Sequence, residues 1–159
     1  MDPSQLYLNN LQLLVKAGIE YRQYDHEPVL SYEKAREIRE RFRLRGIESK
    51  SLFLKLKDGR YCMFVSVEGE RFDATRIKQL LGSKPSICSD NELVAKTGCV
   101  PKCACPFGHS SDIILIIDQK IFGYERFIYS PGLPDKTIEV LTEDIHRILS
   151  LTPNVIVSY

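Results

Sequence analysis

A β-hairpin in the middle of the chain is the feature that most constrains the fold. Leu52, Leu54 and Leu56 alternate with neighbouring residues over residues 52–56, which is the period of a β-strand. The dipeptide Asp58-Gly59 follows, and it is typical of a two-residue hairpin turn. Residues 61–67 then supply the return strand. The chain is therefore expected to contain at least one antiparallel strand pair near its centre.

Helices and further strands are predicted on both sides of this hairpin. Residues 7–15 have helical spacing of apolar side chains. Helix caps are predicted at Ser31, Asp73, Ser89 and Thr142, and helix ends at Gly18, Gly46, Gly82 and Gly98. Further strands are predicted over residues 21–24, 112–118, 126–130, 137–141 and 155–157. This mixture lacks a regular strand–helix–strand repeat, so we expect the α+β class with a mixed sheet.

The composition indicates one domain over residues 1–159. The chain has no internal repeat and no linker rich in Gly, Ser or Pro. No apolar run approaches the ~20 residues of a membrane span, so no membrane contact is expected. The polar first residues lack the order of a signal peptide, and five cysteines are an odd number. We therefore expect the cytoplasm, with thiols that are free, functional or metal-bound.

Charge is distributed unevenly along the chain. The 22 basic and 21 acidic side chains give a net charge of +1, which argues against a protein coated in positive charge. Residues 31–60, however, hold ten basic and five acidic side chains. This segment is either a phosphate-contacting face for structured RNA or a solvated helix paired by its own glutamates. The candidate RNA-binding residues are Arg36, Arg39, Arg43 and Arg45.

The segment from Gly98 to His109 is the most unusual stretch, with two prolines and three cysteines. It is either a ligand loop whose backbone N–H groups converge on an anion, or a structural turn with small buried cysteines. A metal site of Cys99, Cys103, Cys105 and His109 is a third interpretation, although the spacing is not a standard zinc pattern. A cysteine nucleophile, Cys103 or Cys105 with His109 as base, is a further alternative.

Lys50 is predicted just before the strand at residues 52–56, where its side chain can enter a cleft or lie in solvent. In a cleft, a lysine neutralises a developing negative charge or holds a phosphate or carboxylate. Ser51 has the same ambiguity, and His26 is a further candidate for lining a site. No complete catalytic triad, Walker A motif or G-x-G-x-x-G motif is present.

Several segments occur together in a recognisable order. They are His26-Glu27-Pro28-Val29, residues 46–55 around Lys50, Phe72-Asp73, Gly98-x-x-Pro101-x-x-x-x-Pro106-Phe107-Gly108, and Ser130-Pro131-Gly132. Over residues 20–150 this order resembles the YbaK-like family of aminoacyl-tRNA deacylases, the editing domains associated with prolyl-tRNA synthetase. The resemblance implies a mixed, barrel-like β-sheet surrounded by helices.

The resemblance also implies an activity, hydrolysis of the ester that joins a wrong small amino acid, such as Ala, Cys or Ser, to the tRNA 3′ end. It places the essential lysine at Lys50 and implies no metal or organic cofactor. The implied partner is the acceptor end of aminoacyl-tRNA, with a synthetase as a second partner. The candidate substrate-binding residues are Ser51, His26, Gly98, Pro101, Lys102, Cys103, Ala104, Cys105, Pro106, Phe107, Gly108, Ser130 and Gly132.

The chain departs from the family pattern at three positions. Ser51 stands where many members have Asn, Lys102 stands where the loop has Gly, and Ser130 precedes Pro131 where some members have His. The first two departures motivate an alternative function, a non-catalytic module of the same fold that binds aminoacyl-tRNA or a synthetase.

Overall fold

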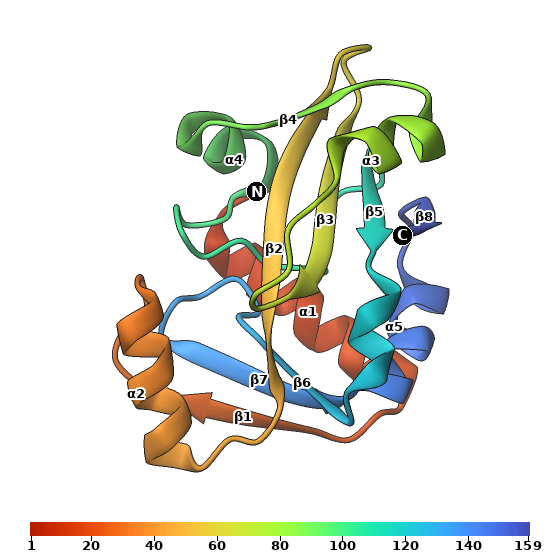
Figure 1. Cartoon of the computed structure of the whole chain (residues 1–159). Coiled ribbons are helices and arrows are strands. Elements are labelled where there is room, and N and C mark those ends of the chain that lie inside the picture. Colours follow the sequence, from red (N-terminus) through yellow and green to blue (C-terminus); the bar gives the residue numbers. More distant parts are fainter.

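In the computed structural model, which describes residues 1–159, five α-helices surround one eight-stranded mixed sheet (Figure 1). The helices are α1 (Pro3–Ala17), α2 (Tyr32–Phe42), α3 (Ala74–Leu81), α4 (Asp90–Thr97) and α5 (Ile145–Leu151). The strands are β1 (Tyr21–Asp25), β2 (Ile47–Leu56), β3 (Tyr61–Val67), β4 (Pro85–Ile87), β5 (Ile113–Ile117), β6 (Arg126–Tyr129), β7 (Lys136–Leu141) and β8 (Ile156–Ser158). None of the helices is long and apolar enough to cross a bilayer.

Strand β2 joins the two halves of the sheet, whose strand order is β1-β7-β6-β2-β3-β5-β8. Its first two residues, Ile47 and Glu48, pair in parallel with β6, whereas residues 49–55 pair antiparallel with β3. In Figure 1 the strands of the first half run at a steep angle to those of the second. The sheet is mixed and strongly curved, as expected for the predicted α+β class, and its pairing ends at β1 and β8.

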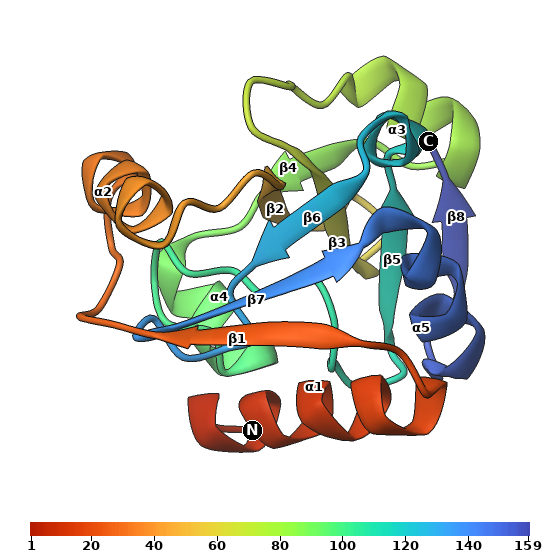
Figure 2. The ribbon, with the colours of Figure 1, turned by 90° about the horizontal axis from the view of Figure 1, so that it is seen from below.

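The second half of the sheet is covered on both faces. From β3, Met63 and Val65 face the larger core, whereas Cys62 and Phe64 face a smaller one. The larger core also contains buried residues of α1 and α5, which lie beside the sheet in Figure 2. The smaller core is closed by Ile77 of α3. Because both faces of β3 are covered, this strand is buried almost throughout and fixes its neighbours in place.

Three of the four predicted helix starts are confirmed. The side chains of Ser31, Asp73 and Ser89 accept hydrogen bonds from the first-turn amides of α2, α3 and α4. Thr142 is wrong as a cap, because its hydroxyl donates to backbone carbonyls at Tyr124 and Glu125. A short 3₁₀ segment, Thr142–Asp144, precedes α5 instead.

Two predicted turns differ from the structure. Helix α2 ends at Phe42 rather than running to Gly46, because Arg43 adopts the left-handed conformation with φ of 54°. The hairpin turn has three residues rather than two, since the Leu56 amide donates to the Arg60 carbonyl. Gly59 has φ of 97°, which suits the left-handed position of a three-residue turn.

The short strand β4 was not predicted.

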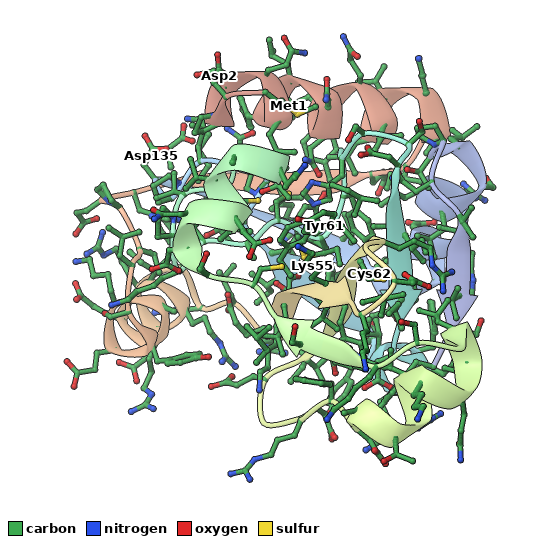
Figure 3. The ribbon with its side chains drawn as sticks, turned by 90° about the horizontal axis from the view of Figure 1, so that it is seen from above. Met1, Asp2, Lys55, Tyr61, Cys62 and Asp135 are labelled. Atoms are coloured by element: carbon green, nitrogen blue, oxygen red, sulfur yellow. The ribbon has the colours of Figure 1, made fainter.

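Gly98 ends α4 against the first residue of the chain, and this contact provides a test of the fold. Figure 3 places Met1 and Asp2 at the start of α1, beside α4. A Cβ atom on Gly98 would lie 2.2 Å from the Met1 carbonyl oxygen. Gly82 ends α3 with a similar φ of 75°, but a Cβ atom on Gly82 would have no neighbouring atom within 4 Å.

We predict that Gly98→Ala lowers the free energy of unfolding by about 3 kcal/mol, because it combines backbone strain with a clash. Gly82→Ala should lower it by about 1 kcal/mol, because it introduces the strain alone. Urea unfolding of both variants measures the difference. Equal losses would show that the contact between Gly98 and Met1 does not constrain the fold.

Candidate active site

A cavity of about 600 Å³ lies on the side of β2 that carries α2 and α4. Both helices appear on that same side of β2 in Figure 1. The walls of the cavity are residues 29–35, β2 residues 48–53, residues 87–93, the loop at 102–104, and Ser130 with residues 134–137. Segments far apart in the sequence therefore meet around one space, whose volume is typical of a site for a small molecule.

Six of the predicted site residues line this cavity: Lys50, Ser51, Lys102, Cys103, Ala104 and Ser130. The others do not. Cys105 and Phe107 belong to the larger core. Gly98, Gly108 and Gly132 pack against the N-terminal helix segment at Met1, Asn10 and Leu6 respectively. Pro101, Pro106 and His26 also lie outside the cavity lining. Within the predicted loop, only residues 102–104 therefore line the cavity, and a role in substrate binding for the other loop residues stays a prediction.

Lys50 lies inside β2, opposite Ser66 of β3, and not before the strand as predicted. Its side chain is half-buried, and its Nζ donates to the Glu70 carbonyl oxygen at 2.6 Å. No carboxylate pairs with this ammonium group. Lys50 thus lines the cavity with an ammonium group that keeps two further N–H donors, which suits it to stabilise an anion.

The loop enters the cavity through a tight turn over residues 100–103. The Cys103 amide donates to the Val100 carbonyl at 2.9 Å. Pro101 is at the second position, and Lys102 has φ of 66°. A positive φ at the third position of such a turn normally requires glycine. Lys102 therefore keeps a glycine-like backbone while placing an exposed cation at the cavity.

The thiols of this loop are protonated and bonded to other groups. Ser130 donates to the Leu133 carbonyl, so the Cys103 thiol, 3.0 Å from the Ser130 hydroxyl, is the donor of that pair. Burial raises the pKa of Cys103 to about 11. His109 contacts the carbonyl oxygen of Cys105 and not its thiol. The structure does not support a cysteine nucleophile, and no three His, Cys, Asp or Glu side chains are grouped to hold a metal ion.

His26 lies one layer behind the cavity wall. Its Nδ1 is 2.7 Å from the Glu27 carbonyl, and its Nε2 is 2.7 Å from the Thr137 hydroxyl. Thr137 itself lines the cavity. His26 therefore holds a lining residue in place and connects β7 to the segment that precedes α2.

The basic helix α2 is partly neutralised by acidic neighbours. Arg39 pairs with Glu68 at 3.0 Å. Lys34 and Arg41 pair with Glu27, whose pKa is held well below its usual range by the Arg41 guanidinium. Arg36, Arg43 and Arg45 are exposed and form no ion pair within the chain. Lys34, Arg39 and Arg41 thus fit the interpretation of a helix paired by glutamates. Arg36, Arg43 and Arg45 remain candidates for phosphate contacts.

Glu48 is a cavity residue that was not predicted from the sequence. It lies two residues before Lys50 on β2, and its half-buried carboxyl group forms no hydrogen bond or ion pair. Burial raises its pKa to about 7, partly opposed by the charge of Arg39. The available signal was the two-residue spacing from Lys50, which places both on one face of a strand. The strand predicted from the alternation of leucines begins at Leu52 and therefore does not include Glu48.

The comparisons with known proteins agree with this geometry. A family model described as an aminoacyl-tRNA editing domain matches residues 26–148, which include Lys50 and the loop. The chain belongs to the aminoacyl-tRNA editing domain family. No curated protein matches the chain at a significant level.

Solved structures share the fold of this editing domain at low sequence identity. One, described as "hypothetical protein APE2540", is 16% identical with a TM-score of 0.79, covering 94% of this chain and 97% of that one. Another, described as "a putative trans-editing enzyme for prolyl tRNA synthetase", is 19% identical with a TM-score of 0.73. That match covers 96% of this chain and 95% of the other. A third, described as "a Putative signal transduction protein" from Marinobacter aquaeolei VT8, is 13% identical with a TM-score of 0.63, and the match covers 92% of this chain but 29% of that chain. These likenesses show the fold.

The unpaired carboxyl group of Glu48 should make the stability of this editing domain depend on pH. Its pKa is about 7 in the folded chain, raised from an ordinary 4.5. As pH rises between these values, the unfolded state ionises while the folded state retains the proton, so folding becomes less favourable.

We predict that Glu48→Gln gains stability relative to the wild type as pH rises. The difference in free energy of unfolding between the variant and the wild type should shift in favour of the variant by about 1–3 kcal/mol between pH ~4.5 and pH ~8. Urea unfolding at the two pH values measures this change. Glu40→Gln, at an exposed glutamate of α2, is the matched control. The prediction fails if the difference between Glu48→Gln and the wild type is the same at both pH values.

Proposed function

We propose that this chain is a trans-editing hydrolase that deacylates mischarged aminoacyl-tRNA and releases a small amino acid such as Ala, Cys or Ser. One observation carries the proposal. In a chain of the editing family, half-buried Lys50 lines a cavity of about 600 Å³, and its ammonium group has no carboxylate partner. An unpaired cation in such a place is suited to an anion that forms during reaction.

The proposed chemistry is ester hydrolysis. Water attacks the ester carbonyl carbon, the carbonyl oxygen becomes an oxyanion, and the bond to the ribose oxygen breaks as that oxygen takes up a proton. Lys50 stabilises the oxyanion with its free N–H donors. The family resemblance implies that the terminal hydroxyl of the tRNA helps to place the water, so the protein needs no complete triad.

Substrate choice depends in this proposal on how closely the walls near Lys50 approach one another, and not on the total volume of the cavity. Its walls include large apolar side chains, among them Leu52, Phe53 and Leu93. A small side chain fits between such walls, whereas a larger one requires them to move. Cys103 and Ser130 add a polar pair at one side. These features support a preference for small amino acids.

Recognition of the tRNA is expected to be independent of sequence. Arg36, Arg43 and Arg45 are exposed near α2, which forms one wall of the cavity, and they remain available for phosphate contacts. The five cysteines are free thiols, which fits a reducing cytoplasm. A synthetase that supplies the mischarged tRNA is a further partner in this proposal.

A non-catalytic module that binds aminoacyl-tRNA or a synthetase is the second candidate function. Lys102 favours it, because its exposed cation stands at the cavity where the family has no side chain. The Ser51 hydroxyl favours it as well, since this oxygen is buried without a hydrogen-bond partner. Tight binding of aminoacyl-tRNA without release of the amino acid would distinguish this function from hydrolysis.

We predict that Lys50→Met lowers kcat/KM for deacylation of alanyl-tRNA by at least about 100-fold, because it removes the charge that stabilises the oxyanion. Release of labelled alanine measures the rate. Lys57→Met, at an exposed lysine of the hairpin turn, is the control and should retain full activity. Thermal unfolding checks that both variants fold. If Lys50→Met keeps wild-type activity, the proposed mechanism is wrong.

We predict that the double variant Arg36→Glu with Arg45→Glu binds deacylated tRNA more weakly and with a shallower dependence on salt. Each lost phosphate contact should reduce the slope of log K against log salt concentration by about 0.7–0.9. The control, Lys57→Glu with Lys84→Glu, makes the same change of charge at the far end of the hairpin. Equal weakening by both double variants would show that only the total charge matters.

A further inference from the structure

We propose that Glu48 is a substrate-binding residue, whose carboxylate binds the α-ammonium group of the aminoacyl ester and thereby selects for aminoacyl over other acyl groups. This inference rests on the proposed function and assigns to the same cavity a second charged contact. It is carried by the position of Glu48 on the cavity wall and by the lack of any partner for its carboxyl group.

The surroundings of Glu48 leave its carboxyl group without a hydrogen bond or ion pair in the free protein. Besides the main cavity, Glu48 borders a small hollow beneath α2 that is lined by Val29, Ala35 and Leu44 among others. The charge of Arg39 acts on Glu48, but its guanidinium bonds to Glu68 at 3.0 Å, and the charge of Glu68 acts on Glu48 in the opposite sense. A partly buried carboxyl group with no hydrogen bond or ion pair in the chain is free to pair with a ligand.

The position of Glu48 relative to Lys50 fits the two ends of an aminoacyl group. Both residues lie on β2 at a spacing of two, so their side chains leave the same face about 6.6 Å apart. The carbonyl oxygen and the α-nitrogen of an amino acid ester are joined through only two carbon atoms. With one hydrogen bond at each end, the group can reach Lys50 with its oxygen and Glu48 with its nitrogen.

The charge of the ligand identifies the group that Glu48 binds. A small neutral amino acid attached to tRNA carries one positive charge, on its α-nitrogen, and every phosphate of the tRNA is negative. Lys50 and Lys102, by contrast, line the same cavity and repel an ammonium group. Two carboxylates line the cavity, Glu48 and Asp90. Glu48 lies two residues from Lys50 on β2, whereas Asp90 is exposed at the start of α4, so Glu48 is the one placed to attract the ammonium group through a charge-assisted hydrogen bond.

The test compares two minihelix substrates that differ only in this charge. One carries alanine at its 3′ end and the other carries propionate, which has hydrogen in place of the ammonium group and is no larger. After division by the uncatalysed hydrolysis rate of each ester, kcat/KM of the wild-type protein is expected to favour the alanyl substrate by about 10- to 100-fold. Glu48→Gln should lower kcat/KM for the alanyl substrate by that factor and leave the propionyl substrate unchanged.

The control is Asp90→Asn, which removes the lining carboxylate at the start of α4. It should leave the preference for the alanyl substrate intact. If Glu48→Gln lowers activity on both substrates by the same factor, Glu48 acts as a base or a structural residue and the inference is wrong. If the wild type does not prefer the alanyl substrate, the inference is also wrong.

Failure of the proposed function can be separated from failure of this inference. Should the wild type hydrolyse neither substrate, hydrolysis is excluded, and the dissociation constants of the two intact minihelices report on Glu48 directly. The inference then predicts tighter binding of the alanyl minihelix by the wild type and equal binding of both by Glu48→Gln. Equal binding by the wild type would overturn it.

Discussion

The register of strand β2 is the constraint on which the rest of the structure depends. This strand pairs with β6 at its start, with β3 along most of its length and with β4 at its end. Its side chains enter two cores, with Phe53 in one and Leu54 in the other. A slip by one residue would exchange these faces and would move Glu48 and Lys50 away from their present positions. The packing of β2 therefore sets the geometry of the site.

The cavity concentrates features that cost stability. Glu48 has a carboxyl group without a partner, the Ser51 hydroxyl is buried without one, and Lys102 adopts a backbone conformation that favours glycine. Each is unfavourable by itself and persists because the surrounding sheet and cores hold it. The presence of three such features around one cavity is consistent with a site for ligand chemistry.

Much of the fold could be predicted from local patterns, because caps and alternation are local interactions. Ser31, Asp73 and Ser89 begin helices as predicted. The failures have tertiary causes. The Thr142 hydroxyl bonds to a neighbouring segment instead of its own helix, and the left-handed Arg43 ends α2 before Gly46.

The site was predicted less completely than the fold. Lys50 was a candidate from its chemistry and from the family resemblance, and it does line the cavity. The loop from Gly98 to Gly108 was assigned as a whole to substrate binding, yet much of it packs against α1. Sequence alone does not show which side of a loop a distant helix covers. Glu48 was missed for a related reason, since its role depends on where β2 begins.

The central claim is that the cavity beside Lys50 hydrolyses aminoacyl-tRNA and selects by size. The most direct measurement is the rate at which the wild-type protein releases the amino acid from a panel of aminoacyl-tRNAs that differ in side-chain volume. We expect release of Ala, Ser or Cys and a steep decline for larger side chains such as Leu and Phe. No release from any member of the panel, or release at rates independent of side-chain size, would contradict the claim.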